Sequence, residues 1–107
     1  MSVVINDDDH FKKVFEEKKG KPIILFFTAT WCGPCKLMKP IVEEKAKENA
    51  GRFTVLLIDV DICEQAVEQY SIDSMPTFLL VINGEIKDSF SSYSPGKFAA
   101  MAEKALK

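Results

Sequence analysis

Apolar residues follow two kinds of pattern along this chain, and each kind predicts a different element. Nearly unbroken apolar runs are typical of strands that are covered on both faces, and they lie at residues 22–28, 53–58 and 77–82. Apolar positions spaced by three and four residues predict helices, which we expect at residues 7–19, 36–48, 62–70 and 94–106. Two weaker strands are predicted at residues 3–5 and 85–90.

Turn and cap signals separate these segments. Asn83-Gly84 is a strong two-residue hairpin signal, so the strand after it should run antiparallel to the one before. Asp7, Asp8 and Asp9 suit the first turn of a helix, where we expect solvated side chains rather than a metal site, and His10 should be a surface residue.

The helical spacing also predicts which side chains face the core. The first helix should bury Phe11, Val14 and Phe15. The helix after the second strand should bury Leu37, Met38, Ile41, Val42 and Ala46. The last helix should bury Phe98, Met101, Ala102 and Leu106.

The predicted order of elements is strand, helix, strand, helix, strand, helix, strand, strand, helix. Such an order gives an α/β fold with a mixed five-stranded sheet and helices on both of its faces. A chain of 107 residues is long enough for one core, so we predict a single domain over residues 1–107.

Composition and charge narrow the function classes. The net charge is −2 and the lysines alternate with acidic residues, which argues against a nucleic-acid footprint. No apolar run is long enough for a membrane span, and the first six residues do not resemble a signal peptide. Three cysteines do not form a secreted disulfide framework, so we expect a cytoplasmic protein. We also expect a monomer without a membrane partner.

The candidate chemistry lies where the apolar run at residues 22–28 gives way to the next helix. There Cys32 and Cys35 are three residues apart, with Gly33 and Pro34 between them and Lys36 directly after. The start of a helix favours an anion, so Cys32 should be the attacking thiolate. Residues i and i+3 are neighbours on a helix, so Cys35 should resolve the mixed disulfide.

The residues between and beside the two thiols suit this role. Pro34 fits a first helical turn because the N–H that it lacks would be unpaired there, Gly33 leaves room for a partner chain, and Lys36 adds positive charge. Half of a zinc site is the main alternative for such a spacing. Only Cys63 and His10 could complete it, and neither belongs to a second paired motif, so we expect no metal.

The string from Trp31 to Lys36, together with Met75-Pro76-Thr77 forty residues later, resembles the thioredoxin family over the whole chain. The resemblance implies the thioredoxin fold and a protein-disulfide reductase without a bound cofactor. An NADPH-dependent thioredoxin reductase would re-reduce it, and peroxiredoxins would be among its partners. An oxidase or isomerase is a weaker interpretation, since those relatives usually have a His between the cysteines.

The resemblance also assigns roles beside the dithiol. An X-Pro bond is cis in only about 5–6% of cases, but the family implies a cis Met75–Pro76 bond whose preceding residue pairs with an extended substrate. Trp31, Met75, Pro76 and Thr77 are therefore expected to bind substrate, although Trp31 and Met75 could also be core residues. Cys63 is either a small buried apolar residue or a regulatory thiol.

Two departures from the family bear on the chemistry. Most members carry a buried Asp six residues before the first cysteine, and bacterial members often pair it with a Lys. Here these positions are Phe26 and Leu57, so the usual proton acceptor for Cys35 is missing and the core should be dry and repacked.

We therefore expect Cys35 to lose its proton to solvent or to the departing thiolate, with slower resolution. A scaffold module of low turnover is the alternative function that Phe26 leaves open. In addition, Phe90-Ser91-Ser92 stands where the family usually has a Gly in a loop beside the reactive thiol, and a serine there should narrow the substrate groove and shift the choice of partner.

Overall fold

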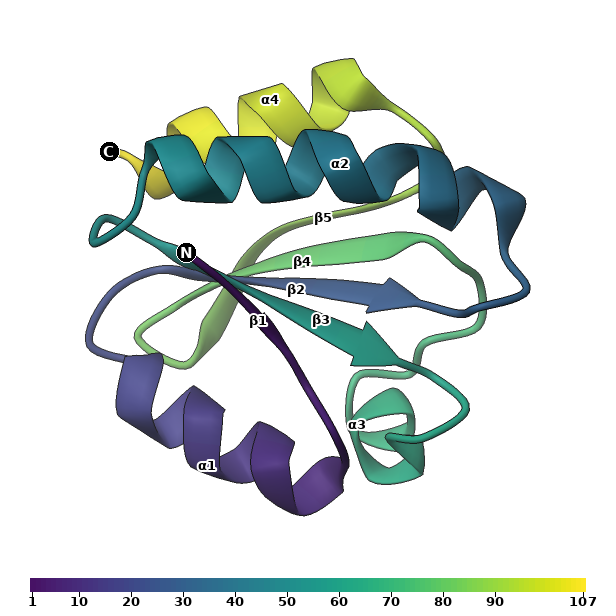
Figure 1. Cartoon of the computed structure of the whole chain (residues 1–107). Helices are drawn as coiled ribbons and strands as arrows, with labels where there is room; N and C mark the ends of the chain where they lie inside the picture. Colours follow the sequence, from purple (N-terminus) through teal and green to yellow (C-terminus); the bar gives the residue numbers. More distant parts are fainter.

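The computed structural model describes all 107 residues as one five-stranded mixed sheet between two pairs of helices (Figure 1). The strands are β1 (Ser2–Val4), β2 (Ile23–Thr28), β3 (Thr54–Asp59), β4 (Thr77–Ile82) and β5 (Glu85–Ser91). The helices are α1 (Asp8–Lys18), α2 (Gly33–Glu48), α3 (Glu64–Gln69) and α4 (Pro95–Ala105). The predicted order of elements is confirmed, and so is the predicted fold class. None of these helices combines the length and the hydrophobicity needed to span a bilayer.

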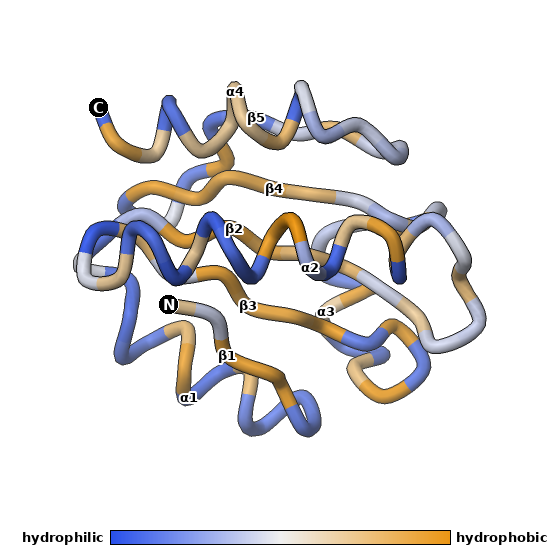
Figure 2. Tube along the Cα trace, turned by 45° about the horizontal axis from the view of Figure 1, so that its top comes forward, coloured by the Kyte–Doolittle hydropathy of each residue, from blue (hydrophilic) through white to orange (hydrophobic).

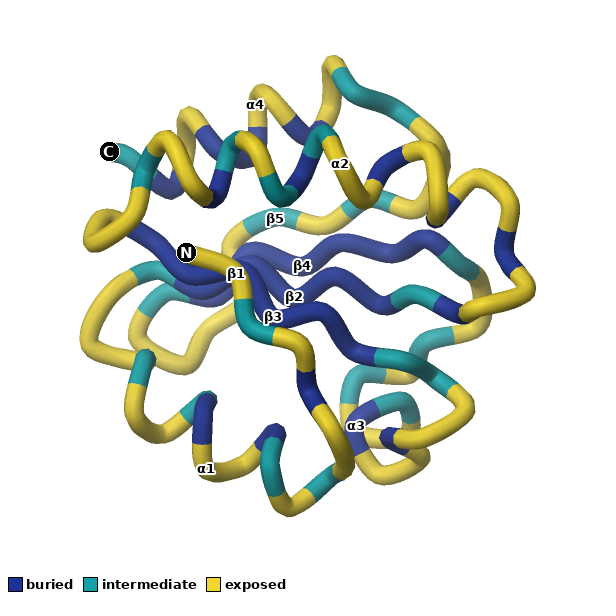
Figure 3. Tube along the Cα trace, in the orientation of Figure 1, coloured by how far each residue is buried: buried dark blue, intermediate teal, exposed yellow.

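The sheet has the strand order β1-β3-β2-β4-β5. The first three of these strands are parallel, whereas β4 runs antiparallel to both β2 and β5. In Figure 1, α2 and α4 cover one face of the sheet, and α1 and α3 cover the other. Because both faces are covered, the three inner strands β2, β3 and β4 are apolar at successive positions (Figure 2) and buried along nearly their whole length (Figure 3).

The core therefore consists of two layers. The layer under α2 and α4 contains 17 buried residues, among them both Cys32 and Cys35. The layer under α1 and α3 contains 12, among them Cys63. Successive strand residues alternate between the two layers, as Phe26 and Phe27 do on β2.

The local signals mostly act as predicted. The side chain of Asp7 caps α1 by accepting from the His10 N–H at 2.7 Å, and Ser94 caps α4 by accepting from the Lys97 N–H at 3.1 Å. Asn83 and Gly84 both have positive φ, which the tight turn between β4 and β5 requires.

Several boundaries and faces differ from the predictions. The third helix begins at Glu64 rather than at residue 62, because Cys63 is its N-cap, and strand β1 ends before Ile5. Phe15, Ile41 and Leu106 are only half-buried.

Leu37, predicted to face the core, is 61% exposed. Cys35, Met38, Val42 and Ala46 form the buried stripe of α2. Leu37 lies roughly 200° around the helix axis from Cys35, and therefore points to solvent.

Candidate active site

The two cysteines of the Cys-x-x-Cys motif lie at the start of α2, after the short loop that follows β2. Cys32 is the N-cap residue of the helix, with extended backbone angles, and Cys35 lies in the first turn. Their Cα atoms are 5.3 Å apart and the two residues are joined as a disulfide. The Cys35 N–H donates a hydrogen bond to Cys32 Sγ at 3.2 Å. A donor directed at the Cys32 sulfur stabilises negative charge on it, and this supports the prediction that Cys32 is the attacking thiolate.

The two cysteine residues differ in their exposure to solvent. Cys32 is 6% exposed and Cys35 only 1%, and both belong to the layer under α2 and α4. Gly33, Pro34 and Lys36 are exposed around them. A Cβ at Gly33 would contact no atom within 4 Å, so packing inside this chain does not require a glycine there. An incoming disulfide therefore reaches Cys32 first.

Trp31 lies beside Cys32 as an exposed side chain. It is 64% exposed, which excludes the interpretation as a core residue. Its Nε1–H donates to Asp61 Oδ2 at 2.8 Å, so the indole is held in place although it is open to solvent. Asp61 was not predicted from the sequence. Its only signal was an acidic residue just after an apolar strand, at the sheet edge where the dithiol was expected.

The Met75-Pro76-Thr77 segment enters β4 next to the same core layer. The Met75–Pro76 bond is cis, as the resemblance implied. Met75 is half-buried and packs against the layer that contains both cysteines. Thr77 Oγ1 donates to the Ser74 carbonyl oxygen at 2.7 Å and lies 2.8 Å from Ser91 Oγ, which fixes the segment against β5. Ser91 and Ser92, the serines of the stretch predicted to narrow the groove, are both exposed. Substrate binding at this segment stays a prediction.

Phe26 takes part in an aromatic stack across three strands. Its ring is fully buried and stacks on Phe78 at 4.6 Å, and Phe78 stacks on Phe90 at 4.7 Å. Phe26 and Leu57 are register partners on β2 and β3, so the two apolar replacements inferred from the sequence are neighbours. The 17 residues of this layer include no charged side chain. The core beside the dithiol is thus dry, and it offers no group that could take a proton from Cys35.

Cys63 lies on the opposite layer, away from the dithiol. The residue is fully buried, and its thiol is free. Burial raises the pKa of the Cys63 thiol to about 11, and the nearby carboxylates Asp8, Asp59 and Asp7 add to the rise. These properties favour the interpretation as a small apolar residue. A regulatory role stays a prediction that requires local opening of the fold.

Ionisation of Cys63 should make the fold less stable at alkaline pH. The ordinary pKa of 9.0 applies in the unfolded chain, whereas the folded value is about 11. Between these values the unfolded chain gives up a proton that the folded protein keeps, so the free energy of unfolding falls as pH rises, by about 3 kcal/mol in all. Urea unfolding of the reduced protein between pH 8 and 11 should show this slope. Cys63→Ala should remove it, and an equal slope in that variant would contradict the assignment.

Two of the three acidic residues at the start of α1, Asp7 and Asp8, cap helices. Asp7 caps α1, and Asp8 accepts from the N–H groups of Gln65 at 3.1 Å and Ala66 at 3.0 Å at the start of α3. The expectation of a solvated turn is therefore wrong for Asp8. His10 is half-buried, and its Nδ1 accepts from the Asn6 N–H at 2.9 Å. No group of three or more His, Cys, Asp and Glu side chains in the chain could hold a metal ion.

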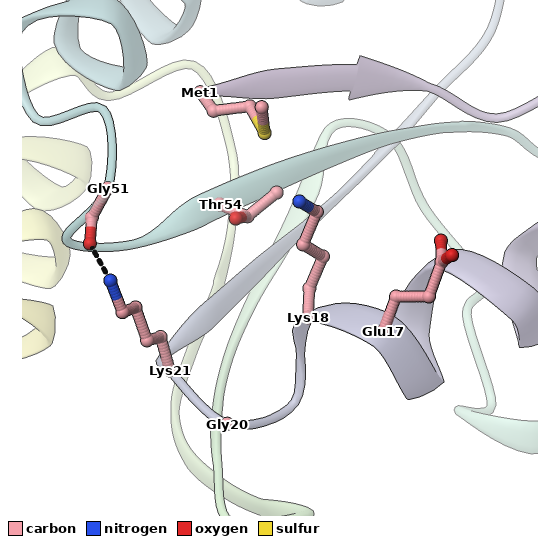
Figure 4. Close-up of a pocket in the computed structure, with 7 residues that line it drawn as sticks. All are labelled: Met1, Glu17, Lys18, Gly20, Lys21, Gly51 and Thr54. Atoms are coloured by element: carbon pink, nitrogen blue, oxygen red, sulfur yellow. Dashed lines mark hydrogen bonds between the residues drawn. The ribbon is translucent and has the colours of Figure 1, made fainter.

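Two pockets lie at opposite ends of the parallel strands. One, of about 600 Å³, is at the carboxyl ends of β2 and β3 and includes Cys35 in its wall. The other, of about 380 Å³, is at the amino ends and is lined by Met1, Glu17, Lys18, Gly20, Lys21, Gly51 and Thr54 (Figure 4). Lys21 Nζ donates to the Gly51 carbonyl oxygen there. This second pocket holds no thiol, so the redox chemistry belongs to the first end.

The whole chain is similar to known proteins of one family. The family model described as Thioredoxin matches residues 2–104. Thioredoxin-1 of Drosophila melanogaster is 37% identical over 107 residues, which cover 100% of this chain and 99% of that protein. The thioredoxin of Rickettsia conorii is 42% identical over 82 residues, 77% of each chain. Among solved structures, the germline-specific thioredoxin Deadhead of Drosophila melanogaster aligns with a TM-score of 0.90 and 35% identity, covering 95% of this chain and 97% of that one.

Proposed function

Since this chain belongs to the thioredoxin family, we propose that it acts in the cytoplasm as a general reductant of protein disulfides. The family and the paired Cys32 and Cys35 make it a thiol–disulfide oxidoreductase that acts on disulfide-containing proteins. The observation that carries the broader role is the unequal burial of two thiols at the start of one helix. Cys32, the more exposed of the two, reacts with the substrate, and the more buried Cys35 then attacks the mixed disulfide.

The reaction follows from this arrangement. The Cys32 thiolate attacks a substrate disulfide, so that its S–S bond breaks and a mixed disulfide forms, while the first substrate thiolate leaves with the electron pair. The Cys35 thiol then loses its proton and attacks Cys32 Sγ. The mixed disulfide breaks, the second substrate thiolate leaves and is protonated, and the Cys32–Cys35 disulfide forms. Two electrons have then passed from the protein to the substrate.

The surface around Cys32 supports docking of protein substrates. Trp31 is exposed yet held by Asp61, and a fixed, flat apolar side chain is suited to a partner's surface. Met75 and the cis Pro76 lie at the entry to β4, whose first residue is tied to β5 through Thr77 and Ser91. We assign substrate binding to Trp31 and to the Met75-Pro76-Thr77 segment on this basis.

The electron source and the location are part of the same proposal. A carrier that holds two electrons as a dithiol needs a reductant, and an NADPH-dependent thioredoxin reductase is the partner that the family implies. Peroxiredoxins are proposed among the acceptors. A reducing compartment suits a protein with a third, unpaired thiol at Cys63, and cell fractionation of the tagged protein would test the cytoplasmic assignment.

A coupled assay tests the function. Oxidation of NADPH would be followed with thioredoxin reductase, this protein and insulin as the disulfide substrate, with Cys32→Ser as the matched control. We expect turnover like that of an ordinary thioredoxin and none in the control. Turnover lower by orders of magnitude would instead favour a binding module, whose partners should still bind Cys32→Ser. Oxidised peroxiredoxin in place of insulin tests the proposed acceptor.

A further inference from the structure

Cys35 must lose a proton before it can act, and the core on one side of it cannot accept one. This side is the apolar layer that contains Phe26 and Leu57. The only buried polar residues of the chain are Thr54 and Thr77, and neither carries a carboxyl group. The proton therefore has to leave by another side of the thiol.

The pocket of about 600 Å³ provides such a side. Its wall includes Cys35, and its single carboxylate is Asp59, from the end of β3. Figure 1 shows the carboxyl ends of β2 and β3 and the first turn of α2 on the same side of the molecule. The pocket is open to solvent and has polar lining groups, so it has room and hydrogen-bond partners for water.

The strand register places Asp59 on the same face of the sheet as Cys35. Thr28 and Asp59 are register partners, two residues beyond the partners Phe26 and Leu57. Side chains two residues apart on a strand share a face, so Thr28 and Asp59 lie on the face that α2 covers. The apolar pair Phe26 and Leu57 is thus followed on the same face by the polar pair Thr28 and Asp59, next to the first turn of α2, which carries Cys35.

Asp59 is also held in a fixed orientation. Its Oδ1 accepts from the Asp61 N–H at 2.8 Å, while Oδ2 has no partner in the protein. The residue is partly exposed, so water can reach the free oxygen. The only other charged groups in the pocket wall are Lys36 and Lys39 of α2, and the parts contributed by β1, β2 and the connecting loops are uncharged. Both ammonium groups favour a thiolate at Cys35.

We propose that Asp59 takes the Cys35 proton through a water molecule in this pocket during resolution of the mixed disulfide. The Cys35 S–H bond breaks, water accepts the proton and passes one of its own to Asp59 Oδ2, and the Cys35 thiolate attacks Cys32 Sγ. The S–S bond to the substrate breaks, the Cys32–Cys35 bond forms, and the substrate thiolate leaves with the electron pair. The proton then passes from Asp59 to solvent. Asp59 is thus the proton acceptor for the resolving step. This assignment rests on the thiol–disulfide exchange given under the proposed function.

The test separates attack from resolution. The reduced protein is mixed with the aromatic disulfide DTNB in a stopped-flow instrument, where attack by Cys32 releases one coloured thiolate and resolution by Cys35 releases a second. Asp59→Asn keeps an oxygen for the Asp61 N–H but is a poor proton acceptor. We expect its second phase to be about tenfold slower below pH 7, with the first phase unchanged. A general base in direct contact typically contributes about a hundredfold or more, and we expect a smaller effect here because a water molecule lies between Asp59 and the thiol.

The pH profile and matched variants complete the test. The difference should shrink as pH rises, because solvent base then takes the Cys35 proton directly, and Asp59→Glu should recover part of the rate. Asp9→Asn makes the same charge change at an exposed site and should match the parent in both phases. A second phase in Asp59→Asn equal to the parent's at every pH would overturn the proposal, and so would equal slowing of both phases. Absence of any first phase would instead overturn the proposed function.

Discussion

Replacing Cys35 with serine should leave a protein that attacks one disulfide and then cannot release it. Cys32 would still form the mixed disulfide, because its access and its hydrogen bond from the residue 35 N–H do not depend on the second sulfur. The resolving thiol would then have to come from solution. Since an oriented intramolecular group acts at a very high effective concentration, we expect turnover of insulin to fall by about a thousandfold or more.

Intact mass measurement shows this outcome directly. Cys35→Ser, mixed with a substrate that contains one disulfide, should gain the mass of that substrate and lose it on addition of dithiothreitol. Cys32→Ser is the matched control and should gain nothing, since its two remaining thiols, Cys35 and Cys63, are only 1% and 0% exposed in the parent. A covalent complex on Cys32→Ser as abundant as that on Cys35→Ser would show that the two thiols have exchanged their assigned roles.

Removing the central ring of the aromatic stack should have the largest effect on stability. Phe78 contacts Phe26 on one side and Phe90 on the other, and its ring lies 5.5 Å from that of Phe98 on α4. Phe78 is fully buried, so Phe78→Ala leaves a cavity shared by three strands and a helix. We expect a loss of about 3–5 kcal/mol in the free energy of unfolding.

Urea unfolding of the oxidised protein gives this value. Phe78→Leu keeps most of the volume and should lose clearly less than Phe78→Ala. Ile86→Ala, at a residue that is 52% exposed on the edge strand β5, should change stability by no more than about 0.5 kcal/mol. If Phe78→Ala cost as little as Ile86→Ala, the stack would not be a main source of stability.

The same stack explains why Asp59 is a better site than Phe26 for testing proton transfer. Phe26→Asp would remove a buried ring from the stack and place an unpaired carboxyl group among apolar residues. Loss of stability and a change in the resolution rate would then occur together. Asp59→Asn alters one atom at a partly exposed residue and leaves the core unchanged.

The sequence predicted those parts of the fold that depend on local pattern. Buried parallel strands need continuous apolar runs, and a two-residue hairpin needs backbone angles that Asn83-Gly84 readily adopts. The strands and the hairpin could therefore both be predicted from the sequence. The position of the dithiol at a helix start followed in the same way. The cis bond at Met75–Pro76 was accessible only through the family resemblance, since trans is the general preference.

The sequence could not predict contacts between distant segments. The bond between Trp31 and Asp61 joins residues 30 apart, and the cap that Asp8 provides for α3 joins residues 57 and 58 apart. Neither leaves a local pattern. Leu37 was misplaced for a different reason: it is apolar and adjacent to the buried stripe in sequence, but a helix turns neighbouring residues to different sides.

The position of Trp31 gives this protein a built-in optical reporter. Trp31 is the only tryptophan in the chain, it is next to Cys32 in sequence, and the bond to Asp61 limits its motion. All indole emission therefore comes from a single place beside the reacting sulfurs. Changes in emission during oxidation, reduction or partner binding are consequently local signals, and the kinetics of the dithiol can be followed without attaching a dye.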